Sequence, residues 1–136
     1  MPLKIELKPG EKCIVSGAVI TNGGARRCEL VFENKVSILR EKEIIRPEDA
    51  NTPCKNLYFT VQLMYIDSDN MDRYCTSYSS QIIEIMKAAP SLAEPINSIT
   101  KLVMDQKYYK ALAQTKTLIE MEKKLLEEAL SAGHGV

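Results

Sequence analysis

The sequence has very little histidine: the only one among its 136 residues is His134, in a glycine-containing segment at the C-terminal end. A serine or cysteine nucleophile elsewhere in the chain therefore has no histidine to activate it, and a catalytic site needs a base that a second group orients. Glycine-rich loops of the P-loop or dinucleotide-binding type are also missing. These absences predict a protein that is not an enzyme.

The four cysteines do not form a metal-binding pattern. Cys13, Cys28, Cys54 and Cys75 are scattered along the chain without a C-x-x-C spacing, whereas a structural zinc site requires four convergent ligands. We therefore expect free thiols, with no metal and no cofactor. Cys54 lies near an expected helix start, where the local field lowers a thiol pKa, so we expect it to be the most reactive of the four.

Long apolar segments are missing as well. No run approaches the roughly 20 residues that a helix needs to cross a bilayer, and the N-terminus shows no basic leader followed by an apolar segment. The apolar content of 45% is ordinary for a globular protein with a packed core. We expect a cytoplasmic protein that makes no membrane contact.

Neither sign of charge is in excess, since 18 basic residues balance 18 acidic ones. The two parts of the chain differ, however. Residues 1–46 contain nine basic and six acidic side chains, a net charge of +3, and residues 47–136 contain nine and twelve, a net charge of −3. A polyanion would have to be bound locally by the N-terminal part, because the whole chain has no positive field.

Residues 1–46 predict a small antiparallel β module. Apolar and charged residues alternate over residues 3–8, as in a half-buried strand, and Pro9-Gly10 ends that strand. Asn22-Gly23-Gly24 predicts a hairpin turn, because these residues tolerate a positive φ. We expect four or five short strands, over residues 3–7, 12–20 with a break at Gly17, 28–32 and 36–39.

Residues 47–136 predict a helical region, so the fold class is α+β. Thr52-Pro53 is a helix cap followed by proline at the first helical position. A flexible tail is expected from about residue 132. We expect three or four helices, at about 53–66, 71–89, 91–103 and 106–130, the last two either separate or joined as one.

The short strands leave exposed edges that need cover. Either the helical region packs on them or two copies of the chain exchange strands. In the last helix Leu112, Ile119 and Leu126 approximate a heptad seam, too short for a coiled coil but suited to a helical hairpin or a dimer contact. We therefore expect a homodimer.

Short sequence blocks follow one another in a fixed order along residues 3–66. The blocks are Lys8-Pro9-Gly10-Glu11, Gly17-Ala18-Val19-Ile20-Thr21-Asn22-Gly23, Ile38-Leu39-Arg40-Glu41-Lys42, Thr52-Pro53 and Val61-Gln62-Leu63-Met64-Tyr65. In this order they resemble a known family, the flagellum biosynthesis repressor FlbT of α-proteobacteria. The resemblance implies a post-transcriptional repressor of flagellin synthesis, which binds the 5′ untranslated leader of flagellin mRNA and affects its translation or decay.

The last expected strand runs into Arg40-Glu41-Lys42-Glu43-Ile44. Through this motif and other short patterns, residues 3–46 are also similar to the carbon storage regulator CsrA, whose late strand ends in an Arg-Glu-Glu-Ile-like motif. Leu7-Lys8 stands where that regulator has two arginines. The similarity implies that Lys8 and Arg40, from the first and last strands, meet on an RNA-binding surface. The candidate RNA-binding residues are Lys8, Arg26, Arg27, Arg40 and Lys42.

A second class of function stays open. The protein could regulate through its helices, by binding a flagellar protein such as a FlaF-like regulator or flagellin itself without touching RNA. The two alternatives differ in their response to salt, because affinity for RNA falls with salt according to the phosphates neutralised, whereas helix-groove binding is far less sensitive.

Overall fold

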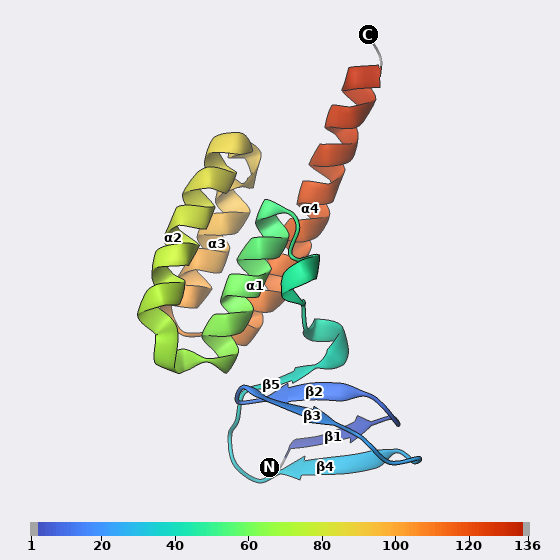
Figure 1. The fold of residues 1–136 in the computed structure, drawn as a ribbon. Helices are drawn as coiled ribbons and strands as arrows, with labels where there is room; N and C mark the ends of the chain where they lie inside the picture. Colours follow the sequence, from blue (N-terminus) through green and yellow to red (C-terminus); the bar gives the residue numbers. More distant parts are fainter. Residues whose placement is uncertain (1–2, 135–136) are drawn as a thin grey trace. The chain divides into compact units, whose positions relative to one another are not determined.

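The structure, a computed structural model, describes residues 3–134, and for residues 132–134 it describes the backbone only. The chain divides into two compact units, one containing the residues up to Ile44 together with Ile66–Ser68, the other containing Ile45–Tyr65 and the residues from Asp69 onward. All strands of the described residues lie in the first unit, and the second unit is helical (Figure 1). The prediction of an α+β fold is confirmed.

The first unit contains two small antiparallel sheets rather than one. Strand β1 (Leu3–Leu7) pairs with β4 (Cys28–Phe32), while β2 (Lys12–Val15) is the central strand between β3 (Ala18–Thr21) and β5 (Ile38–Arg40). Each sheet contributes one apolar face to a shared core, which buries the side chains that alternation places on the same face of each strand. Its buried members are Ile5, Leu7, Cys13 and Ile38, with Val15, Ile20, Cys28, Leu30, Phe32 and Val36 packed against them.

The tight hairpin turn lies at Ser16-Gly17. Their φ angles are 49° and 90°, and Val15 pairs with Ala18, which is the geometry of a two-residue type I′ loop. The predicted hairpin at Asn22-Gly23-Gly24 was wrong, because β3 and β4 belong to different sheets and the segment from Asn22 connects them. The last strand also begins later than predicted, at Ile38 rather than at residue 36.

The second unit contains four α-helices in the described residues: α1 (Pro53–Ile66), α2 (Met71–Ala88), α3 (Ala93–Met104) and α4 (Tyr108–His134). The predicted first helix is confirmed at both ends. The third begins at Ala93 rather than at residue 91, because Pro90–Leu92 form a 3₁₀ turn. Helix α4 continues to His134 and thus includes the first residues of the expected tail, of which Gly135 and Val136 lie outside the described residues.

Helices α3 and α4 are separate because the chain reverses at Gln106. Its φ is +60°, and the N–H groups of Gln106 and Lys107 donate to the carbonyls of Val103 and Leu102 at 3.0 and 2.8 Å. This pair of bonds is the Schellman arrangement that satisfies the last carbonyls of a helix, with glutamine at the left-handed position that glycine usually occupies.

Polar side chains link the helices of the second unit in pairs. The Thr60 hydroxyl donates to the Gln81 amide oxygen at 2.8 Å, joining α1 to α2, and Tyr78 and Thr100 share a 2.8 Å bond that joins α2 to α3. Burial raises the pKa of Tyr78 above its ordinary value. These contacts fix the positions of the helices relative to one another within the second unit.

Candidate functional site

All five predicted RNA-binding residues have exposed side chains and lie around one end of the first unit, where β1 ends and β2 begins. We call this surface the cationic end and define it by the five side chains. Its members are Lys8, Arg26, Arg27, Arg40 and Lys42.

Lys8 is placed by a tight turn. The Glu11 N–H donates to the Lys8 carbonyl at 3.0 Å, and Gly10 has a φ of +79°. Proline at the second position and positive φ at the third are the signature of a type II turn. The Glu11 carboxylate accepts a hydrogen bond from the Lys8 N–H at 2.9 Å. Both main-chain groups of Lys8, its N–H and its carbonyl, are therefore hydrogen-bonded within the turn.

Arg40 is placed by the sheet. It is the last residue of β5 and pairs with Cys13 of β2, and its N–H donates to the Glu43 carboxylate at 2.9 Å. Lys42 follows in the 3₁₀ turn Glu41–Glu43. The acid three residues after Arg40 thus accepts the same hydrogen bond as the acid three residues after Lys8, although the two turns differ in type.

Lys8 and Arg40 lie at the same end of the first unit. A hollow of about 390 Å³ is lined by residues 8–11 of the turn and by Glu41, the residue that follows Arg40. The β2–β5 register agrees, since Cys13 lies two residues after Glu11 and pairs with Arg40. That the two side chains meet on one RNA-binding surface stays a prediction.

Asn22 links the remaining segments, a role that the sequence did not predict. Its side-chain amide donates to the carbonyls of Leu7 at 2.9 Å and Arg26 at 2.8 Å, and its amide oxygen accepts from the Gly24 N–H at 3.0 Å. Its main chain also contacts the turn: the Asn22 carbonyl accepts a hydrogen bond from the Gly10 N–H at 2.8 Å, and the Asn22 N–H donates to the Glu11 carbonyl at 3.0 Å. One buried amide thus holds the segments of Lys8 and Arg26 beside each other.

Among the described residues, Arg27, unlike Lys8 and Arg40, has its charged group close to a carboxylate, that of Glu6. Its Nη1 lies 3.3 Å from Glu6 Oε2, with both side chains 62% exposed. An exposed pair of this kind contributes about 0.2 to 1 kcal/mol and exchanges readily with other anions. We therefore expect Arg27 to contribute less to an anion-binding surface than Lys8 or Arg40.

The first unit offers no aromatic platform for stacking bases. Phe32 is the only aromatic residue among residues 1–46, and it packs against the core of the two sheets. The groups that the cationic end offers to a nucleic acid are therefore ammonium, guanidinium and main-chain groups, without an aromatic ring.

The prediction that Cys54 is the most reactive thiol is contradicted. Its side chain is fully buried, and the helix start beside it is already occupied, since the Glu122 carboxylate accepts the Cys54 N–H at 2.9 Å and the Thr52 hydroxyl at 2.6 Å. Burial and this carboxylate raise the pKa of Cys54 to about 12. Cys75 is the exposed thiol. Among the side chains that the structure describes, those of residues 3–131, no three metal-ligating groups are close enough to bind an ion.

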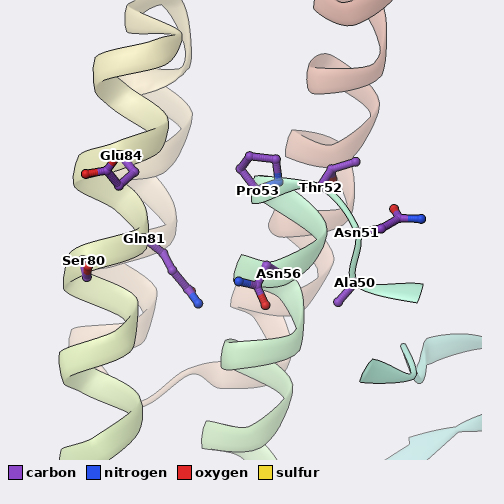
Figure 2. Close-up of a pocket in the computed structure, with 8 residues that line it drawn as sticks. All are labelled: Ala50, Asn51, Thr52, Pro53, Asn56, Ser80, Gln81 and Glu84. Atoms are coloured by element: carbon purple, nitrogen blue, oxygen red, sulfur yellow. The ribbon is translucent and has the colours of Figure 1, made fainter. Parts of the chain in front are cut away.

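A second hollow, of about 420 Å³, lies in the second unit between the start of α1 and the middle of α2 (Figure 2). Its only charged lining residue is Glu84, so it does not suit a phosphate. The residues that line it are Ala50, Asn51, Thr52, Pro53, Asn56, Ser80, Gln81 and Glu84.

A family model described as "Flagellar protein FlbT" matches residues 3–126. The chain belongs to the FlbT family. Its similarity to the flagellum biosynthesis repressor protein FlbT of Caulobacter vibrioides is 41% identity over 138 residues, covering 98% of this chain and 97% of the relative. A probable FlbT repressor of Rhodopseudomonas palustris is 40% identical over 126 residues, covering 93% of this chain and 98% of the relative.

No solved structure matches the chain, so the similarity of residues 3–46 to the carbon storage regulator stays a prediction. In the described part of the chain, none of the helices has the length and apolar character needed to cross a bilayer.

Proposed function

We propose that this member of the FlbT family represses flagellum biosynthesis after transcription, by binding the 5′ untranslated leader of flagellin mRNA with its cationic end. The observation that carries the proposal is that Lys8 and Arg40 both lie on hydrogen-bonded main chain at one end of the β unit. The names of the relatives, flagellum biosynthesis repressors, support the regulatory role.

The cationic end suits a polyanion because its cations are exposed while two neighbouring acids are engaged with the main chain. Glu11 and Glu43 accept the N–H groups of Lys8 and Arg40, respectively, at 2.9 Å each. Charges carried on ordered strand ends lose little conformational freedom on binding, which favours affinity.

Within this surface the cations have different roles. The Arg40 guanidinium offers five donors in a planar fork and can bind a guanine edge or a phosphate with two bonds, whereas Lys8 and Lys42 act as point charges toward phosphates. Because no aromatic ring is available for stacking, the target is an RNA loop whose backbone and base edges are exposed. Protein bound to the leader would block translation of the flagellin mRNA or alter its decay.

The test is binding of purified protein to a labelled flagellin leader, with a scrambled leader of equal length as the RNA control. Lys8→Ala combined with Arg40→Ala should weaken binding at least about tenfold, since a bidentate arginine contact is worth about 1 to 3 kcal/mol. Lys35→Ala is the matched protein control, because this exposed cation lines a different hollow, with Leu3 and Phe32.

The alternative partner is a protein. If the doubly substituted protein keeps its circular dichroism spectrum and binds the leader as tightly as the parent, the cationic end is not the RNA site. If the parent does not prefer the leader over the scrambled RNA at all, the proposal fails. Regulation through the helices, on a FlaF-like protein or flagellin, then becomes the better account.

A further inference from the structure

The outer part of α4 carries an apolar face that the described residues of the second unit leave uncovered. In the inner part of the helix Ala111, Leu112 and Leu118 are fully or almost fully buried. Further along, Leu126 is 51% exposed and Leu130 is 66% exposed. Figure 1 shows the same division, with the last turns of α4 extending past α1, α2 and α3.

The exposed residues form one continuous face with the half-buried Leu125. Leu125 and Ala129 are four residues apart, as are Leu126 and Leu130, and residues three and four apart lie on the same side of a helix. This face continues the stripe through which the inner part of α4 packs against its own unit. The stripe is therefore longer than the bundle that covers it.

The flank of this face has a charge pattern that is complementary to itself. Lys123 and Glu127 are exposed and four residues apart, on the Leu130 side of the apolar face. From residue 125 onward the opposite flank is formed by Leu125 and Ala129 and carries no charge, and the Glu122 carboxylate one turn earlier is already bound by Thr52 and Cys54. A two-fold axis through the middle of this segment sets the Lys123 of each copy against the Glu127 of the other.

We propose that the outer part of α4 binds the same segment of a second copy of this chain in an antiparallel pairing centred near Leu125. Leu126 and Leu130 of each copy lose their exposure in the pairing, and the two charged flanks face each other. A parallel pairing would instead put the charged flank of one helix against the apolar flank of the other. Antiparallel association is isologous and closes at a dimer.

Sedimentation or light scattering of the full chain measures the result. The parent should have twice the 15.3 kDa mass of the single chain at micromolar concentration, and Leu126→Asp should give a monomer, since it places a charge in the seam. Met104→Asp is the matched control, because Met104 is 77% exposed on α3 and lies outside the proposed face. A monomeric parent, or a dimer that survives Leu126→Asp, would overturn the proposal.

The charged pairs test the direction of the helices. In a dimer of the Lys123→Glu variant, the new carboxylate of each copy would face Glu127 of the other. In a dimer of Glu127→Lys, the new ammonium group would face Lys123 of the other copy. Each variant alone should therefore be a monomer, because like charges meet. Mixing the two variants should restore a dimer, since every pair is then opposite in sign. Failure of the mixture to associate would exclude the antiparallel register. None of these outcomes depends on RNA binding, so the dimer and the RNA site are tested separately.

Discussion

Asn22→Ala is the substitution that we expect to disturb the cationic end most strongly without removing a cation. It deletes three side-chain hydrogen bonds, of 2.9, 2.8 and 3.0 Å, to Leu7, Arg26 and Gly24. Each such bond contributes about 0.5 to 1.5 kcal/mol net, and a partner left unsatisfied in a buried position adds to the loss. We therefore expect the free energy of unfolding to fall by about 2 to 4 kcal/mol.

Urea unfolding followed by far-ultraviolet circular dichroism measures this loss. Asn22→Asp is the sharper companion variant, because one carboxylate oxygen still accepts the Gly24 N–H while the other faces the carbonyl oxygens of Leu7 and Arg26. At neutral pH it should destabilise the protein at least as much as alanine does. A loss below about 0.5 kcal/mol for both variants would refute the assignment of Asn22 as the link between these segments.

Three further predictions concern the remainder of the chain. Thiol labelling of the native protein at pH 8 should modify Cys75 first and Cys54 last, because the Cys54 pKa of about 12 leaves almost no thiolate; fast labelling of Cys54 would contradict its burial. Glu122→Ala should lower the free energy of unfolding by about 2 to 4 kcal/mol, because it removes two hydrogen bonds to a charged acceptor. Glu122→Gln keeps an acceptor for the Cys54 N–H, so in the same urea titration the loss should be about 1 kcal/mol. Gln106→Gly should raise the free energy of unfolding by about 1 kcal/mol, since left-handed strain of about 1 to 2 kcal/mol outweighs the added freedom of the unfolded chain; a loss of stability would show that the glutamine side chain matters.

Local signals predicted the elements that are set by local chemistry. Thr52-Pro53 marks the start of α1 at Pro53, and alternation over residues 3–7 marks β1, since caps and apolar period act within a few residues. The end of α3 was not predictable in this way, because nothing about Gln106 indicates the left-handed conformation that it adopts.

Long-range contacts decided the features that the sequence did not predict. Both Ser16-Gly17 and Asn22-Gly23-Gly24 tolerate a positive φ, and only the pairing of β3 with β2 rather than with β4 selects the first as the hairpin. Likewise the sequence places Cys54 near a helix start, but not the Glu122 carboxylate, 68 residues further along, that occupies it.

The candidate site divides along the same line. The proximity of Lys8 and Arg40 was predicted from the likeness of residues 3–46 to another regulator, and the structure places both at one end. The sequence did not predict the role of Asn22, because the carbonyls that its side-chain amide binds come close to it only in the folded β unit. An Asn-Gly-Gly segment that follows a strand was the one available signal.

The central claim is most directly tested by the salt dependence of leader binding in the parent and the Lys8→Ala, Arg40→Ala protein. Each phosphate of a single-stranded RNA that the protein neutralises contributes about 0.7 to the slope of log affinity against log salt. We predict that the double substitution makes the slope shallower by about 0.7 when Arg40 binds a base edge and by about 1.4 when it binds a phosphate, while Lys35→Ala leaves it unchanged. An unchanged slope in the folded double variant would contradict RNA binding by the cationic end.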